Sequence, residues 1–470
     1  MYLASVAGQE DFFSLVFGNY ALNRTISFCV LDPFIFRPLL YFILGAEQFF
    51  FKYHFPAWQL AGIIGHLLVV VALYSLLRAI RPGWPAVLAA GSFSLLMVNV
   101  PLVNWPNIHA YLLFMALFLL ILREAYLFRA DLDSARVKKA AWMFFFAILI
   151  YDAGTVFSLP LFLYFAFLFP RSRRHQALWI MLPVAVYAAL SSLDLYFIHP
   201  YIGSEPARIA QGLVSWKILF YFFITLKWLF LAGIFAAPAE MAELGRTVLL
   251  PHTLGWAWPF TGWSPYLLRG SAFLVMCGFL LAIGSRKDFF SKHQAFFYLL
   301  ASILLGYVLL IVCGRMASRG ILGGPFLNCH YFYFFWMVLI VLFYSMLDWA
   351  KCCAFQYWRS FMIVAVFLML LMMLAGAFSL RAVNAMTARV HSRPRVFLAN
   401  LGGFVQAHKG EPDFSFFIPH SCSGNYPGRW LHKHGDPKWR RYTLAEVLYP
   451  EFYRPLGQAK YRLSCPDHDQ

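Results

Sequence analysis

The sequence predicts an all-α polytopic integral membrane protein, and two observations lead to that class. Of the 470 residues, 61% are hydrophobic and only 13% are charged, and the mean hydropathy is +0.65. Soluble domains are about 45–50% apolar and about 25% charged. Apolar runs of the roughly 20 residues that cross a bilayer also recur along the chain. A soluble enzyme is therefore excluded, and the 51 Phe residues exclude intrinsic disorder.

A bundle of roughly ten transmembrane helices follows from counting the apolar runs. The runs that meet the length requirement directly are 58–77, 86–104, 110–128, 176–197, 267–284, 295–314, 331–348 and 361–379.

Two further apolar stretches need separate treatment. Residues 140–170 are too long for one untilted span and are broken at 151–154, which predicts two short helices that meet at the outer face. Residues 216–236 carry Lys217 and Lys227, so they either span with a second crossing at 247–263 or form a re-entrant segment.

Basic residues in short loops predict the orientation, because such loops remain on the cytoplasmic side. Placing all of these clusters inside makes most spans alternate correctly, although 198–267 needs one more crossing or a re-entrant segment. The clusters contain Arg78, Arg81, Arg129, Arg136, Lys138, Lys139, Arg171, Arg173, Arg174, Arg286, Lys287, Lys292, Lys351 and Arg359. The basic residues behind the net charge of +17 set the topology and meet anionic lipid headgroups from these short loops. Nucleic acid is therefore not an expected partner.

Three regions are expected along the chain. Residues 1–57 form a first outer loop with an interfacial helix near 39–55, residues 58–379 form the transmembrane domain, and residues 380–470 form a small extracytoplasmic C-terminal region. In that last region, Cys422 and Cys465 either form a disulfide or remain free thiols.

Familiar nucleotide-binding, zinc-protease and hydrolase motifs are missing from the sequence, which disfavours an ATP-driven pump. Acidic residues instead collect in the first outer loop. Glu10 and Asp11 can act there as a general base or hold a divalent cation, the one candidate cofactor, or they can simply favour a helix N-terminus.

Two further side chains are candidates on their residue type and place. Arg37 precedes Pro38, which can begin the next helix, and its guanidinium can bind phosphate oxygens or anchor the chain to lipid headgroups. His66 lies within a predicted span, where it is a ligand-binding residue or a hydrogen-bonded packing residue. Asp152 and Lys227 are the other notable charges within the spans.

Several short segments together resemble the GT-C superfamily of membrane glycosyltransferases. The similarity is greatest to the family-39-like branch with the bacterial relatives of transmembrane O-mannosyltransferases. It covers about residues 1–170 and 315–348. The segments that carry it are Glu10–Phe13, Phe36–Leu39, the span Trp58–Arg78 with Gly65 and His66, the end of the next span at Val100–Trp105, and Asn328–Tyr333.

This resemblance implies a GT-C-like bundle, with a first span upstream of residue 1, that uses a polyprenyl-phosphate sugar as donor. Asp11, next to Glu10, would deprotonate the hydroxyl of a glycan, lipid or protein acceptor, and the sugar would transfer with inversion. Arg37 would stabilise the phosphate, and Arg315 and Arg319 are assigned the same role from their location alone. His66, Trp105, His330 and Tyr331 would contact substrate.

The resemblance places this activity at the extracytoplasmic face of a multi-pass protein in a bacterial inner membrane. Two other classes remain open. One is a transporter or flippase for a lipid or polyisoprenoid, and the other is an inactive GT-C-like scaffold that binds glycolipid or partner proteins.

Overall fold

A computed structural model describes residues 37–51, 55–96, 99, 109–197, 222, 225, 229, 294–312, 329–352, 415–417 and 462–464. The helices are α2 (Pro38–Phe51), α3 (Phe55–Ile80), α4 (Trp84–Ser94), α6 (His109–Asp131), α7 (Ser134–Ile150), η3 (Asp152–Phe157), α8 (Ser158–Leu168), η4 (Arg171–Ile180), α9 (Leu182–Phe197), α15 (Gln294–Ile311) and α16 (Cys329–Cys352).

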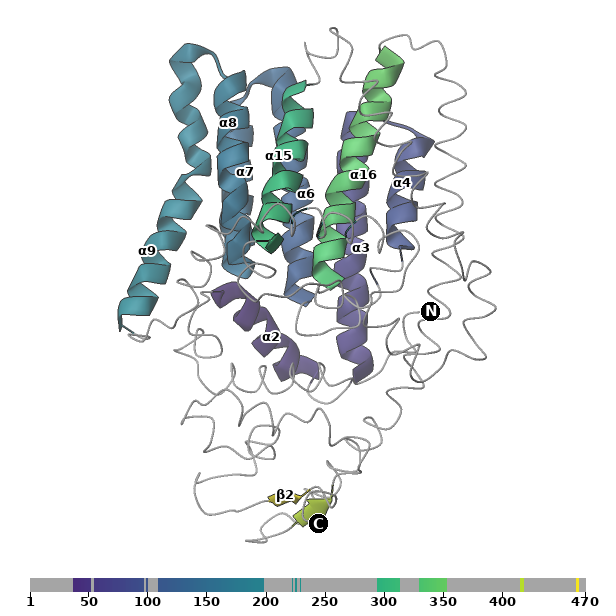
Figure 1. Cartoon of the computed structure of the whole chain (residues 1–470), viewed down its shortest axis with the longest axis vertical. Helices are drawn as coiled ribbons and strands as arrows, with labels where there is room; N and C mark the ends of the chain where they lie inside the picture. Colours follow the sequence, from purple (N-terminus) through teal and green to yellow (C-terminus); the bar gives the residue numbers. More distant parts are fainter. Residues whose placement is uncertain are drawn as a thin grey trace.

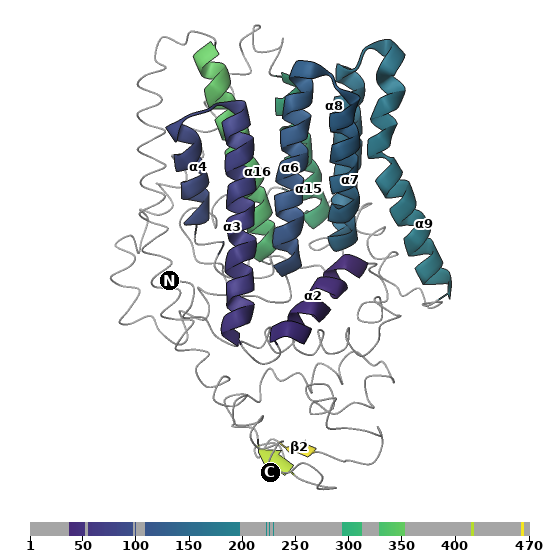
Figure 2. The same cartoon turned by 180° about the vertical axis from the view of Figure 1, so that it is seen from behind.

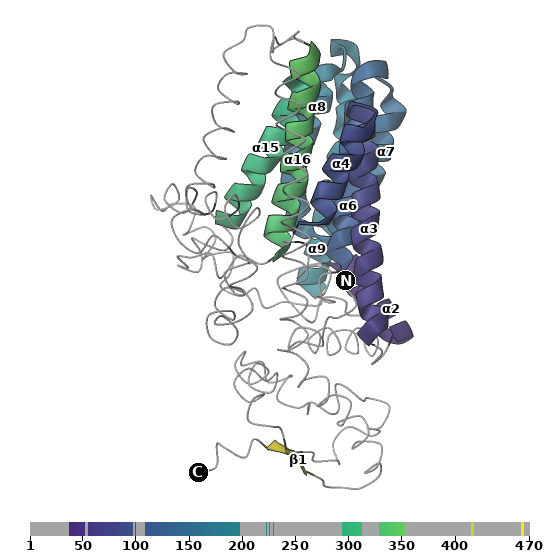
Figure 3. The same cartoon turned by 90° about the vertical axis from the view of Figure 1, so that its right-hand side faces the viewer.

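The described part of the chain is a helical bundle with a helix across one end. Helices α3, α6, α7, α8, α15 and α16 run along the bundle, whereas α2 lies obliquely at their lower end (Figures 1 and 2). The side view shows α2 beside the first turns of α3 (Figure 3). Two short strands in the C-terminal region, β1 (Ser415–Phe417) and β2 (Arg462–Ser464), pair in parallel.

Three segments in the described part are long and apolar enough to cross a membrane. They are Ala57–Ile80, His109–Asp131 and Arg171–Leu193. The helical fold and the presence of helices able to cross a membrane therefore agree with the prediction, whereas the count of about ten spans also depends on residues outside the described part. The expected spans 267–284 and 361–379, and nearly all of 216–236, fall there.

Helix α4 corrects one predicted span. The apolar run 86–104 predicts a continuous helix, but α4 ends at Ser94. The Ser92 and Ser94 hydroxyls donate to the carbonyls of Leu88 and Gly91, and the buried Asn99 amide donates to the Phe93 carbonyl. Such side-chain bonds compete with continued helix, which hydropathy alone does not detect.

The break predicted within residues 140–170 is present. Helix α7 ends at Ile150, Tyr151 is extended, and η3 leads into α8. A β-carbon on Gly154 would lie 2.9 Å from Cε2 of Phe114, so glycine permits η3 to approach α6 closely. The start of α2 at Pro38 likewise agrees with the proline's expected place in the first helical turn.

Stacked aromatic rings fill the centre of the bundle. The Phe334 ring on α16 lies parallel to Phe157 on η3, with centroids 5.3 Å apart, and 4.4 Å from Tyr307 on α15. Phe114 and Phe118 on α6 pack against the same ring. Four elements far apart in the sequence are therefore joined through one aromatic cluster.

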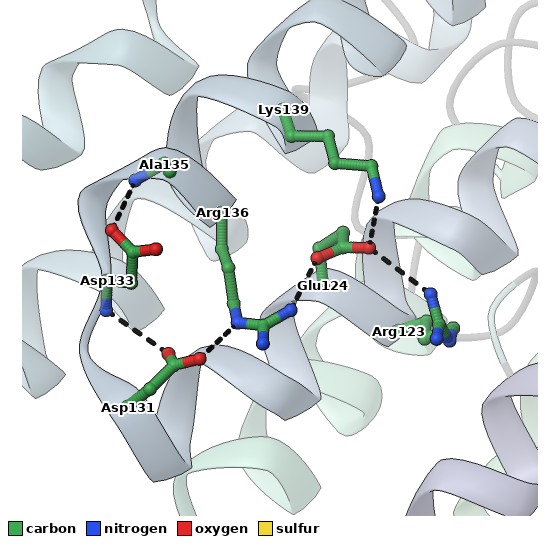
Figure 4. A network of polar contacts seen from close by, with 7 residues as sticks. All are labelled: Arg123, Glu124, Asp131, Asp133, Ala135, Arg136 and Lys139. Carbon is green, nitrogen blue, oxygen red and sulfur yellow. Dashed lines mark hydrogen bonds and ion pairs between the residues drawn. The ribbon is translucent and has the colours of Figure 1, made fainter.

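An ion-pair network closes the turn between α6 and α7 (Figure 4). The Glu124 carboxylate, only 3% exposed, accepts from Lys139 at 2.8 Å, from Arg136 at 2.9 Å and from Arg123 at 3.3 Å. Arg136 also donates to Asp131 at 2.6 Å. The cations of this turn are therefore largely neutralised by carboxylates within the protein.

The basic turns gather at one end of the bundle. The α3–α4 turn with Arg81, the α6–α7 turn and η4 lie at the upper end in Figure 1, opposite α2. Tyr344 of α16 donates to the Arg81 carbonyl at 2.9 Å, which brings the late part of α16 to the same end. The described basic turns thus share one end, as the loop-charge pattern predicts.

Candidate functional site

The candidate site lies where α2 meets the ends of α6 and η3. Arg37 immediately precedes α2, and its Nε and Nη2 atoms each lie 2.6 Å from Oδ1 of Asp152, the first residue of η3. Its Nη1 donates to the Tyr111 hydroxyl of α6 at 2.6 Å. These contacts hold a charged group beside the start of α2, the helix that lies at the end of the bundle opposite the basic turns (Figure 1).

Aromatic rings flank this guanidinium. The Arg37 carbon Cζ lies 5.2 Å from the ring centroid of Tyr151 and 5.8 Å from that of Tyr111, within the range of cation–π attraction. Burial lowers the pKa of Arg37, but attraction to Tyr111 and Asp152 outweighs burial and raises the pKa well above its usual value. Arg37 is therefore a permanent positive charge.

Two N–H groups of Arg37 have no partner among the described residues and can bind a ligand. A guanidinium has five N–H donors in a planar fork, and the three bonds to Asp152 and Tyr111 use one donor on each nitrogen. The side chain is 16% exposed, so the site is open to an anion only over a small surface. The arrangement can orient a phosphate oxygen and stabilise its charge.

A second polar pair lies at the same end. Oε1 of Glu47 on α2 is 3.3 Å from Nδ1 of His109 on the first turn of α6, and both side chains are mostly buried. Oε2 of Glu47 is buried and has no hydrogen-bond partner among the residues that the structure describes. Together with Arg37, this pair attaches α2 to α6 through polar contacts.

His66 is separate from this site and lies between α3, α4 and α16. It is 3% exposed, its Nε2 is 3.2 Å from the Ser94 carbonyl, and its Nδ1 is 2.7 Å from the Tyr333 hydroxyl. A carbonyl can only accept, so Nε2 carries the hydrogen and Nδ1 accepts from Tyr333. These bonds favour the packing interpretation of His66.

Most predicted site residues fall outside the described part of the chain. Glu10, Asp11, Trp105, Arg315 and Arg319 are among those residues. His330 and Tyr331 lie in the first turn of α16, where only the backbone is described. Among the residues predicted to bind donor phosphate or substrate, only Arg37 and His66 have described side chains, and they do not contact each other.

Sequence reasoning missed the partners of Arg37. Asp152 was noticeable as a lone carboxylate at a break in an apolar stretch, but nothing linked it to a residue 115 positions away. Glu47 and His109 likewise carried no signal that would pair them across 62 positions. In the described part of the chain, no cluster of three or more His, Cys, Asp or Glu is placed to hold a metal ion.

Comparisons with protein-family models, with curated proteins and with solved structures find no match to this chain. The fold and the composition define the class of helical proteins with several helices that are apolar and long enough to cross a membrane.

Proposed function

We propose that this protein is a membrane glycosyltransferase that moves a sugar from a polyprenyl-phosphate donor to an acceptor hydroxyl. The observation that supports it best is the position of Arg37. Its guanidinium lies beside an oblique helix at one end of an apolar bundle, with two N–H groups not used by Asp152 or Tyr111. A carrier phosphate near the membrane surface, with its polyprenyl chain among the helices, suits that position.

In the proposed reaction the acceptor oxygen attacks the anomeric carbon of the donor sugar. The hydroxyl proton passes to Asp11, with Glu10 beside it, as the new glycosidic bond forms with inversion. The bond between the anomeric carbon and the phosphate oxygen breaks, and the carrier phosphate leaves with the electron pair. Arg37 stabilises the charge that develops on this phosphate, and Arg315 and Arg319 add positive charge nearby. Trp105, His330 and Tyr331 are the proposed substrate contacts, whereas the bonds of the buried His66 to Tyr333 and Ser94 assign it to packing.

The test measures sugar transfer in membranes supplied with a panel of radiolabelled polyprenyl-phosphate hexoses. Wild type is expected to transfer one of them, and Asp11→Asn and Arg37→Gln are expected to lower turnover by about 100-fold or more. Asp133→Asn serves as the control, because Asp133 caps α7 at the other end and asparagine caps helices equally well.

The outcomes separate the proposal from its alternatives. Equal transfer by wild type and Asp11→Asn would remove Asp11 from the role of base. Movement of labelled donor across the bilayer without transfer would identify a transporter or flippase, and donor binding without either process would identify a scaffold. No transfer from any donor by folded protein contradicts the glycosyltransferase proposal.

A further inference from the structure

We propose that η4, together with Lys138 of α7, binds the headgroup of an anionic phospholipid. The η4 surface is defined here as the side chains of Lys138, Arg171, Arg173, Arg174 and Trp179. It lies at the end of the bundle that carries the basic turns, and it is independent of the proposed glycosyl transfer.

The charges of the η4 surface are not neutralised within the described part of the chain. Arg171, Arg173 and Arg174 are exposed, and no carboxylate among the described residues pairs with them. The α6–α7 turn at the same end differs, because Glu124 and Asp131 bind its cations (Figure 4). The η4 surface therefore retains the positive charge available to an external anion.

An exposed apolar patch adjoins these arginines. Leu178 is 55% exposed, Trp179 is 42% exposed and Leu182 is 50% exposed, whereas Ala177 and Ile180 are buried in the bundle. A soluble anion gains nothing from such a patch, but a lipid places its acyl chains beside it and its phosphate beside the arginines.

Lys138 connects the two parts of the η4 surface. Its Nζ atom lies 5.3 Å from the ring centroid of Trp179, a cation–π contact that holds an ammonium next to the indole. Basic side chains and an indole at one level of the bundle are typical of the boundary between headgroups and acyl chains.

Helix α9 continues this surface along the bundle. Figure 1 shows α9 running from the upper end, where η4 precedes it, along one side of the bundle. Val186, Leu190 and Leu193 on α9 are exposed. An acyl chain from a headgroup bound at η4 would lie along these side chains, so the surface fits a phospholipid better than a nucleic acid or a peptide.

The test is native mass spectrometry of the full-length protein in detergent, titrated with phosphatidylglycerol or phosphatidylcholine. Wild type should bind phosphatidylglycerol more tightly. In the variant Arg171→Gln/Arg173→Gln/Arg174→Gln, the apparent Kd for phosphatidylglycerol should be about 100-fold higher than in wild type. Each basic residue near an anionic lipid surface contributes about 1 kcal/mol, which is about a fivefold change in affinity. Since these side chains are exposed, the variant should melt at the wild-type temperature.

A charge-matched control is available in the C-terminal region. Arg389→Gln/Arg393→Gln/Arg395→Gln removes the same charge from residues 380–470 and should leave phosphatidylglycerol affinity within about twofold of wild type. Equal losses in both variants would show an effect of net charge alone and would overturn the proposal, as would an unchanged Kd in the η4 variant.

A second arm distinguishes a lipid from its soluble headgroup. Glycerophosphoglycerol, which lacks acyl chains, should compete only weakly, and Trp179→Ser should weaken phosphatidylglycerol binding without the loss of a charge. The lipid assignment would be overturned if glycerophosphoglycerol competed as strongly as phosphatidylglycerol itself. It would also be overturned if wild type bound phosphatidylcholine and phosphatidylglycerol with equal affinity.

Discussion

At the scale of single residues, the polar groups within the bundle are joined by bonds between distant segments. The hydrogen bond from Tyr333 to Nδ1 of His66 links side chains 267 positions apart, and both residues are almost fully buried. A buried acceptor that loses its donor pays the cost of leaving water, which is about 1–3 kcal/mol. The bond therefore favours the relative position of α3 and α16 in which His66 and Tyr333 meet.

Tyr333→Phe should lower the free energy of unfolding in detergent by about 1–3 kcal/mol, because it removes the donor to His66. A double-mutant cycle with His66→Leu isolates the bond. The measured coupling energy should be about 0.5–3 kcal/mol. A coupling energy of zero would show that Tyr333 stabilises the fold by packing alone.

Arg37 shows how one contact can serve both fold and function. Its bonds to Asp152 and Tyr111 connect the residue before α2 to η3 and α6, and they also orient the guanidinium. Because the ion pair is only partly buried, its loss should affect the local position of α2 more than global stability.

At the scale of elements, close approach between segments depends on small residues. In η3, Gly154 faces the Phe114 ring, which also packs against Tyr151 and Phe118. Such a ring has little freedom to move, because its neighbours lie in the same packed core. Small residues at helix contacts are common in membrane proteins for this reason.

Gly154→Ala should destabilise the protein by about 1–3 kcal/mol, because the new β-carbon would meet Phe114 at 2.9 Å. Gly306→Ala in α15 is the matched control. Its β-carbon would meet Val156 at an ordinary 3.5 Å, so alanine should stabilise the helix by about 0.5–1 kcal/mol. Thermal unfolding in detergent measures both changes, and a shift of the same sign in the two variants would contradict the packing argument.

At the scale of the whole molecule, polarity divides the bundle into two unlike ends. One end has the basic turns, with exposed arginines on η4 and the Glu124 network between α6 and α7. The other has α2 and the pairs Arg37–Asp152 and Glu47–His109. The loop-charge rule predicts that the basic end faces the cytoplasm.

Impermeant maleimide labelling tests that orientation. Cysteines introduced at the exposed positions Ala135 and Ser172, in Ala135→Cys and Ser172→Cys, should stay unlabelled in intact cells and become labelled in inverted vesicles. Wild-type protein supplies the background from its eight native cysteines. Labelling of both positions in intact cells would reverse the assignment and would place Arg37 on the cytoplasmic side.

The sequence by itself determined the helical class, the break at Tyr151, the start of α2 at Pro38 and the clustering of basic turns. Each of these depends on local composition or on the backbone chemistry of a few neighbouring residues. The tertiary structure alone decided that Arg37 binds Asp152 and that His66 binds Tyr333. It also showed that α4 ends at Ser94. Pairing between distant residues depends on how whole helices pack, which no local pattern specifies.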